Sequence, residues 1–298
     1  MPRDLFVLRT NFFSSYCGEL LAQISHAGKD VVVCADESKG VVDTADFAKV
    51  RMGLKSIDRL GLYRHEKSAW LCGDYFLYHV LSSVPDYDYY WLVEPDVYFD
   101  FDDISEFLRP LDEVAKDYVV MHYGERRSNW AWYDTVSPYF ETVYGGPYPL
   151  VRLSKAALHF MLAQRQKLSS EYQKTESGRW PNDEAFTATF LANNKFKCSS
   201  FNDLGVGLFA TKSSFRTGLP WLREYLVDKP RSNLVYHSAL GRDDYIDKLK
   251  RHIRMRGRSG DGVDKIVSEY YGKSVLDELK VLEKKSLEVI RNRSEFGK

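Results

Sequence analysis

Short hydrophobic runs and segments with helical spacing alternate along the first part of the chain. Residues 43–60 place hydrophobic side chains at helical spacing, and residues 69–82 are hydrophobic on almost every side, which predicts a deeply buried helix. Four runs rich in β-branched or aromatic residues predict buried strands, at residues 5–8, 31–35, 87–99 and 118–122. Strands that alternate with helices favour an α/β fold, with a mixed, mostly parallel sheet and helices on both faces.

The rest of the chain has a different pattern. Residues 123–149 are rich in aromatic residues but lack periodicity, which indicates irregular structure near a binding surface. Helices are predicted over 155–169 and 182–193, and an amphipathic helix from about residue 274. We therefore expect two parts, a main α/β domain and a basic, amphipathic helical extension, over residues 1–245 and 246–298.

Charge, cysteines and motifs exclude several classes of function. Lys plus Arg and Asp plus Glu are both 42, so the net charge of zero gives no push towards nucleic acid. The cysteines form no C-x-x-C pair, which argues against a zinc site. No G-x-G-x-x-G follows a strand, and neither G-x-S-x-G nor H-E-x-x-H occurs, so a dinucleotide site, a hydrolase elbow and a zinc protease are not supported.

Hydropathy leads us to expect a cytoplasmic protein. No hydrophobic run approaches the roughly 20 residues that cross a bilayer, and the first hydrophobic run is too short for a signal peptide. Residues 248–258 carry only basic charges. They could hold the protein at the inner face of an anionic membrane or attract a phosphorylated glycan, although a solvated helix face is the commoner reason for such a pattern.

Two acids follow the hydrophobic run of residues 89–93. Glu94 and Asp96 are two positions apart, so in an extended chain they point to one face, and their Cα atoms lie roughly 6–7 Å apart. Two carboxylates this close repel each other unless a cation lies between them. A hard divalent cation, Mn²⁺ or Mg²⁺, would resolve this repulsion. Spacing alone leaves open an ordinary solvated strand end.

The order of several motifs resembles that of the GT-A fold glycosyltransferases. Glu94-Pro95-Asp96 stands where their D-x-D motif follows a buried strand. The other matching segments, within a resemblance that covers roughly residues 5–240, are Leu5 to Thr10, Ala35-Asp36-Glu37, Trp70 to Tyr75, Asn182-Asp183-Glu184 and Tyr236-His237-Ser238. The dyad departs from the family pattern in its first acid and in its central proline.

The resemblance implies a role for each of these segments. It makes Glu94, Asp96 and His237 the metal ligands, and Asp183 or Glu184 the catalytic base, which favours inversion at the sugar without excluding retention. The nucleotide-sugar donor would contact Arg9, Thr10, Asn11, Asp36, Glu37, Asp74 and Arg242. The aromatic candidates for acceptor binding are Trp130, Trp132, Tyr148 and Trp180. Asp74 could equally cap its helix, and core packing is an alternative for the aromatic residues.

The sequence therefore predicts a glycosyltransferase acting on a glycan, lipid-linked or polysaccharide acceptor. A sugar nucleotidyltransferase is the alternative enzyme, but its Gly-rich basic loop is missing after the first strand, where the chain reads Thr10-Asn11-Phe12-Phe13. A carbohydrate-binding module without turnover is the other alternative, and it is supported by the Glu and Pro of the dyad.

Overall fold

The computed structural model describes residues 2–65, 67–175 and 178–295, and the chain divides into two compact units. The first unit comprises Met1–Pro95 and Asp103–Phe209, and the second comprises Asp96–Asp102 and Ala210–Lys298. This division differs from the predicted boundary at residue 245. Residues 210–245 belong with the C-terminal helices, because Leu222 and Tyr245 share a core with Leu249. In the same unit β12 (Leu234–Tyr236) pairs with β5 (Tyr98–Asp100).

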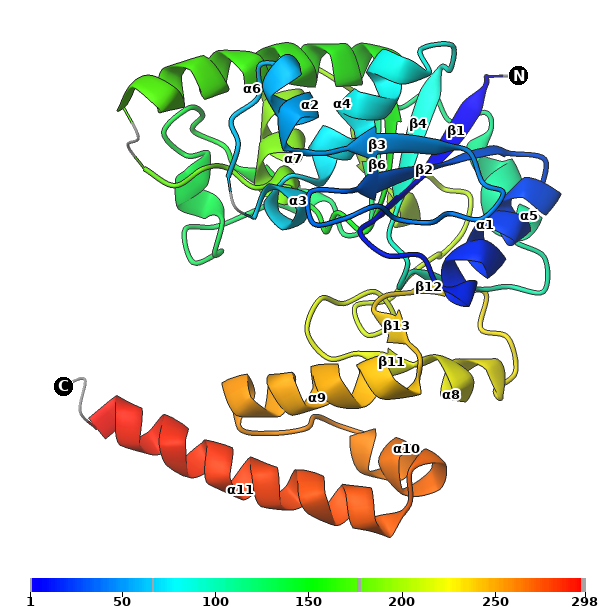
Figure 1. The fold of residues 1–298 in the computed structure, drawn as a ribbon, viewed down its shortest axis with the longest axis vertical. Helices are drawn as coiled ribbons and strands as arrows, with labels where there is room; N and C mark the ends of the chain where they lie inside the picture. The colour runs from blue at the N-terminus through cyan, green and yellow to red at the C-terminus, as the bar shows by residue number, and fades with distance from the viewer. Residues whose placement is uncertain (1, 66, 176–177, 296–298) are drawn as a thin grey trace. The chain divides into compact units, whose positions relative to one another are not determined.

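A seven-stranded sheet forms the centre of the first unit (Figure 1). Its order is β10 (Cys198–Ser200), β6 (Tyr118–Val120), β9 (Leu150–Ser154), β4 (Tyr89–Val93), β1 (Asp4–Thr10), β2 (Asp30–Asp36) and β3 (Lys49–Met52). Strand β9 runs antiparallel to β4 and β6, and the other pairings in the sheet are parallel. The predicted mixed, mostly parallel sheet is confirmed.

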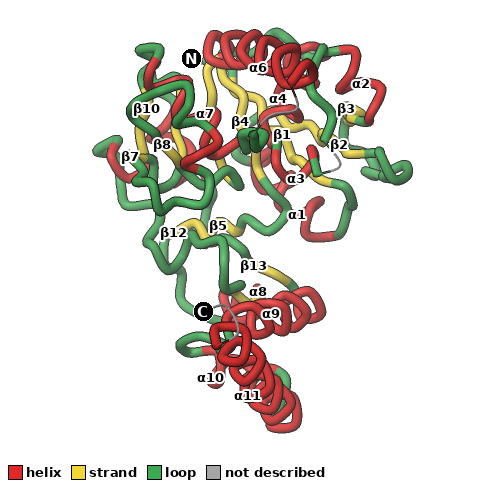
Figure 2. Tube along the Cα trace, turned by 90° about the vertical axis from the view of Figure 1, so that its left-hand side faces the viewer, coloured by secondary structure: helices red, strands yellow, loops and turns green. Residues whose placement is uncertain are grey.

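Helices cover both faces of this sheet. Val7 of β1 belongs to the hydrophobic core formed with α4 (Gly73–Ser83), α6 (Lys155–Thr175) and α7 (Asp183–Asn193). The neighbouring Phe6 points to the other face, where it stacks on Trp91 at a ring distance of 4.7 Å. Figure 1 shows α1 (Ser15–His26) and α5 (Ser105–Leu108) on the side of this second face, where the Phe107 ring of α5 lies 6.1 Å from that of Trp91, and Figure 2 shows α1 from another side. Alternating side chains thus bury both faces, as expected for a central strand.

Two of the predicted helices differ from the structure. The helix expected over residues 43–60 is confirmed only in its last part, which forms α2 (Leu54–Arg59), because β3 occupies residues 49–52 and pairs in parallel with β2. The helix expected over 69–82 is interrupted at Cys72, between α3 (Ser68–Leu71) and α4. The remaining short elements of this unit are η1 (Arg109–Leu111), β7 (Gly124–Glu125), η2 (Tyr133–Thr135), β8 (Tyr144–Gly145) and η3 (Phe201–Asp203).

The second unit contains the predicted C-terminal helical extension. A core that includes Leu249, Ile253 and Leu279 holds together α9 (Arg242–Arg256), α10 (Val263–Tyr270) and α11 (Lys273–Glu295). The basic residues of 248–258 lie on α9 and just beyond it, and contact with a membrane surface stays a prediction. The unit also contains β11 (Trp221–Leu222), α8 (Arg223–Val227) and β13 (Ala239–Leu240).

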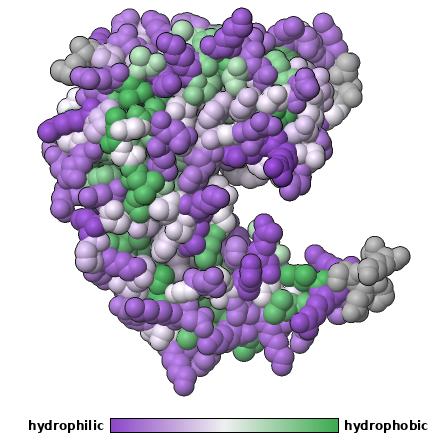
Figure 3. Space-filling view, turned by 180° about the vertical axis from the view of Figure 1, so that it is seen from behind, coloured by the Kyte–Doolittle hydropathy of each residue, from purple (hydrophilic) through white to green (hydrophobic). Residues whose placement is uncertain are grey.

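Both units have a largely hydrophilic surface with smaller hydrophobic areas, as Figure 3 shows for one face. Among the described residues, no helix combines the length and the hydrophobicity that crossing a bilayer requires. Large hydrophobic side chains that remain exposed include Trp70, which is 64% exposed, and Met255. Trp70 belongs to α3 and lies beside the pockets described next.

Candidate functional site

A pocket of about 230 Å³ opens where three strands of the first unit end. Parallel pairing aligns Leu8 of β1 with Val93 of β4, and Thr10 of β1 with Ala35 of β2, so the residues that follow meet at one edge. The pocket is lined by, among others, Arg9, Thr10, Asn11, Asp36, Trp70 and Glu94. Ligands of open α/β sheets bind at the carboxyl ends of the strands, which makes this the candidate functional site.

A second pocket, of about 440 Å³, adjoins the first. The two share Asn11, Asp36, Ala69 and Trp70. The lining of the larger pocket combines the hydrophobic side chains of Met52, Leu54 and Ile57 with polar residues that include Lys39, His65 and Lys67. Hydrophobic walls with a few polar groups are typical of small-molecule sites.

Arg9 connects the smaller pocket to α7. Its Nη2 lies 2.5 Å from Glu94 Oε1, and its Nη1 donates to Asp183 Oδ2 at 3.2 Å. The Arg9 side chain is only 12% exposed. Burial alone would lower the pKa of this guanidinium, but the carboxylates of Glu94 and Asp183 raise it above its ordinary value. Arg9 therefore stays charged between two acids.

Asp183 is the predicted base that the structure brings to this cluster. Its Oδ2 accepts from the Gly73 backbone N–H at 2.7 Å, and α7 begins here with the Asn182 side chain accepting from the Ala185 N–H. Burial raises the pKa of Asp183 to about 7, although Arg9 lowers it. A carboxylate with a pKa near the working pH suits proton transfer. Glu184 is half-buried, and its backbone N–H donates to Asp183 Oδ1 at 2.8 Å.

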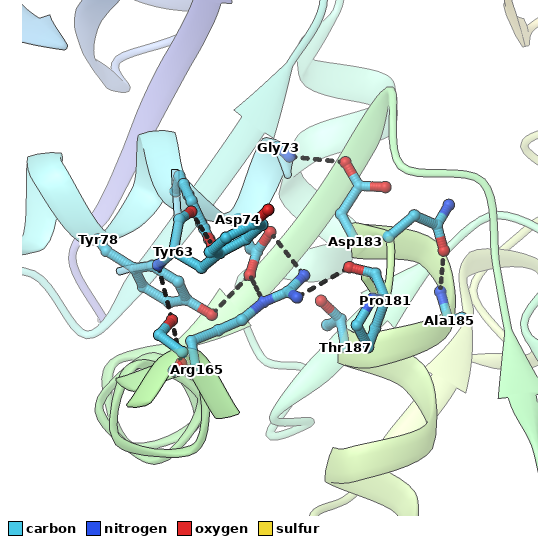
Figure 4. A network of polar contacts seen from close by, with 12 residues as sticks. Tyr63, Gly73, Asp74, Tyr78, Arg165, Pro181, Asp183, Ala185 and Thr187 are labelled. Carbon is cyan, nitrogen blue, oxygen red and sulfur yellow. Dashed lines mark hydrogen bonds and ion pairs between the residues drawn. The ribbon is translucent and has the colours of Figure 1, made fainter. Parts of the chain in front are cut away.

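Asp74 follows Gly73 at the start of α4 and is fully buried, and Figure 4 shows its polar contacts. Its carboxylate accepts from Arg165 Nε at 2.7 Å and Nη2 at 3.2 Å, and from the Tyr78 hydroxyl at 2.9 Å. Arg165 also donates to the Pro181 carbonyl, just before α7. Neither pocket is lined by Asp74. The predicted contact with a donor is therefore not supported, and the carboxylate instead joins α4 to α6.

The predicted metal ligands fall in both units. Glu94 belongs to the first unit, whereas Asp96 and His237 belong to the second. His237 Nε2 lies 3.4 Å from Asp96 Oδ1, and its Nδ1 lies 2.8 Å from the Arg216 carbonyl. Burial raises the pKa of Asp96, but His237 and then Lys248 lower it to well below its ordinary value.

Asp96 and His237 have the chemistry that a divalent metal needs. With Nδ1–H donating to the Arg216 carbonyl, a neutral His237 ring presents the Nε2 lone pair to Asp96, and a backbone carbonyl is a usual partner of metal-binding histidines. One carboxylate oxygen and one imidazole nitrogen fit Mn²⁺, and Mg²⁺ prefers the oxygen. Lys248 Nζ, 3.8 Å from Asp96 Oδ2, is a competing cation.

Other predicted residues have mixed placements. Glu37 binds Lys49 Nζ at 2.7 Å and does not line either pocket, whereas the Asp36 carboxylate lines both. Arg242 lies in the second unit, half-exposed near Glu224. Of the four aromatic candidates for acceptor binding, Tyr148 and Trp180 are buried in the core, whereas Trp130 and Trp132 are half-buried.

Sequence reasoning missed Trp70 as a site residue. Its ring lies 6.2 Å from that of Trp132 and meets it edge-on, and Arg179 lies over the Trp132 ring at 5.1 Å. The available signal was its place in a four-residue helix just before the buried α4. A position so close to a helix start has one side open to solvent even where the following turns are buried.

Comparisons with known proteins give a weak structural resemblance. No family model matches the chain, and no curated protein matches it. Among solved structures, the chain is similar to a glycosyltransferase involved in the glycosylation of the major capsid of PBCV-1. The TM-score is 0.41 and the identity 10%, over 82% of this chain and 98% of that chain. This similarity is too low to assign an activity.

Proposed function

We propose that the protein is a glycosyltransferase that moves a sugar from a nucleotide-diphosphate donor to a carbohydrate acceptor. One observation carries the proposal. A buried carboxyl with a pKa of about 7, Asp183, is bound by Arg9, and Arg9 lines a pocket formed by the ends of three strands. This combination supplies both a proton acceptor and a cationic group, which sugar transfer from a diphosphate donor requires.

The donor would occupy both pockets of the first unit. The nucleoside fits the larger pocket, because the hydrophobic side chains of Met52, Leu54 and Ile57 can pack against a base. The diphosphate would lie in the smaller pocket, towards the guanidinium of Arg9. The resemblance also implies a divalent metal, which Asp96 and His237 of the second unit would hold and which would supply Lewis-acid chemistry.

The acceptor would lose its proton to Asp183. Its hydroxyl would attack the anomeric carbon as the carboxylate takes the proton, an arrangement that favours inversion at that carbon. The exposed ring of Trp70 and the half-buried ring of Trp132 offer hydrophobic faces on which a sugar ring can stack. Glycans, lipid-linked sugars and polysaccharides all present such rings.

A ligand panel tests this function. Nucleoside diphosphates, their sugars and nucleoside triphosphates are compared by thermal shift, with and without Mn²⁺. We expect a Mn²⁺-dependent shift with a nucleoside diphosphate that is lost in Asp96→Ala and kept in Asp261→Ala, an exposed acid of the same unit. The absence of a shift with any nucleotide would refute the proposal.

Two other outcomes would point to the alternatives. Stabilisation by a nucleoside triphosphate alone would indicate a sugar nucleotidyltransferase. Saturable binding of an oligosaccharide, with no response to nucleotides, would indicate a carbohydrate-binding module without turnover. Release of free nucleoside diphosphate from the responding donor, in the presence of acceptor, then establishes transfer directly.

A further inference from the structure

The Glu94 carboxylate already has a cation beside it. Arg9 Nη2 lies 2.5 Å from Glu94 Oε1, and the two side chains are only 12% and 19% exposed. The like-charge repulsion that made a metal at Glu94 attractive in the sequence is therefore relieved by a guanidinium within the first unit. A divalent metal bound directly by Glu94 would stand next to that guanidinium, or would have to displace it, and either change is unfavourable at a mostly buried position.

The packing around Arg9 leaves its guanidinium little freedom to move away. A Cβ atom at Gly73 would lie 1.8 Å from Arg9 Nη1, so the guanidinium fills the space that any other residue at position 73 would occupy. The Phe76 ring lies on another side, 5.7 Å from Arg9 Cζ. Two carboxylates, a helix start and an aromatic ring thus fix the guanidinium, and displacing it would break several contacts together.

The second contact of Arg9 is the one that reaches the proposed base. Arg9 Nη1 and the Gly73 N–H both bind Oδ2 of Asp183, at 3.2 and 2.7 Å. The Glu184 N–H binds the other oxygen at 2.8 Å. These three donors set the orientation of the carboxylate, and Arg9 is the only side chain among them. The position of Arg9 is in turn set by its shorter contact, with Glu94.

The contacts of Asp96 are of another kind. Its carboxylate lies 3.4 Å from His237 Nε2 and 3.8 Å from Lys248 Nζ, and both distances are longer than those of charge-assisted hydrogen bonds; Ser238 also hydrogen-bonds to this carboxylate. A metal that enters between Asp96 and His237 would replace these loose contacts with short metal–ligand bonds. The two acids of the Glu-Pro-Asp motif thus differ in what already binds them.

We propose that Arg9 is a positioning residue, anchored by Glu94, that holds Asp183 in place, and that Glu94 is therefore not a metal ligand. Metal binding falls to Asp96 and His237. The two acids of the motif thus have different roles. Glu94 positions the base Asp183 through Arg9, and Asp96 binds the metal. The part that concerns the base rests on the proposed function, whereas the part that concerns Glu94 and the metal does not.

Mn²⁺ binding to the full chain tests the metal part without any activity. Free Mn²⁺ is titrated by electron paramagnetic resonance against the wild type, Glu94→Gln, Asp96→Asn and the control Asp261→Asn. We expect Glu94→Gln and the control to bind within about threefold of the wild type, and Asp96→Asn to bind at least about tenfold more weakly. Equal weakening by Glu94→Gln and Asp96→Asn overturns the proposal, and so does a wild type that binds no Mn²⁺.

The positioning part is tested by transfer kinetics once a donor is known. We expect Glu94→Gln to lower kcat with the donor KM nearly unchanged, and Arg9→Met to lower kcat at least as much and also to raise the donor KM, because its guanidinium faces the diphosphate. The double variant should lose no more in kcat than the poorer single variant. Arg9→Lys, which keeps the charge and loses the two-pronged contact, should recover only part of the rate. Independent, multiplying losses would overturn the coupling. If no donor supports transfer, the proposed function fails, and the Mn²⁺ titration still decides the role of Glu94.

Discussion

The buried pair of Asp74 and Arg165 allows a sharp prediction about stability. Both side chains are fully buried, and two nitrogens of the guanidinium bind the carboxylate at 2.7 and 3.2 Å. Arg165→Met removes the cation while the thioether chain retains much of its volume. The carboxylate then keeps only the Tyr78 hydroxyl, and the Pro181 carbonyl loses its donor. Breaking a buried pair in this way costs about 3–5 kcal/mol.

Restoring charge balance should recover most of that loss. In the double variant Asp74→Leu/Arg165→Met no charge is buried, and hydrophobic replacements of buried pairs are often neutral in stability. Unfolding of the first unit can be followed in urea by tryptophan fluorescence, since Trp180 lies 5.3 Å from Arg165 Cζ. A single variant within about 1 kcal/mol of the wild type, or a double variant no more stable than the single one, would refute the reasoning.

Three further predictions concern the site itself. Gly73→Ala should lower the free energy of unfolding by about 1–3 kcal/mol, because its Cβ would meet Arg9 Nη1. The control Gly53→Ala has open space around its Cβ and should leave this free energy unchanged. The midpoints of urea unfolding of the two variants measure the difference. Burial raises the pKa of Asp183 from 3.8 to about 7, so the folded state holds a proton that the unfolded state loses first. The free energy of unfolding should therefore fall between about pH 4 and 7, by at most about 1.4 kcal/mol per pH unit, while transfer activity rises through pH 7. The same pH slope of stability in the wild type and in Asp183→Asn would contradict this. Trp70→Ala should weaken nucleotide or acceptor binding by about 1–3 kcal/mol in isothermal titration, with the thermal midpoint unchanged because the ring is 64% exposed. If the variant binds each ligand as tightly as the wild type does, Trp70 contacts neither.

Sequence patterns predicted the strands that consist of continuous runs of buried hydrophobic residues. The runs that became β1, β2 and β4 are hydrophobic on both faces of the sheet, which a central parallel strand requires. The helix prediction for residues 43–60 failed at β3, because the hydrophobic spacing there also suits a strand. Pairing with β2, rather than local preference, determines that β3 forms.

Site residues could be predicted where the residue type and its local spacing indicate the chemistry. They could not be predicted where a residue's contact is with a partner distant in the sequence. The acids at positions 94 and 96 were found from their spacing after a strand. The partner of Glu94, however, is Arg9, which lies on a strand 85 positions earlier and meets it only because β1 and β4 are neighbours. Asp74 and Arg165 are 91 positions apart, so no local pattern indicated that this carboxylate was structural.

The short strand β5 has a consequence for the order of events during synthesis. Its partner is β12, and Asp100 in β5 binds Arg231, which follows it by 131 positions. The backbone of β5 therefore leaves the ribosome long before its hydrogen-bonding partner exists. Because domains fold as their residues emerge, the first unit can fold while residues 96–102 are still without their partner, before the rest of the second unit is synthesised. A stalled chain whose residues up to about 215 have left the ribosome should accordingly resist protease in the first unit and be cleaved within residues 96–102.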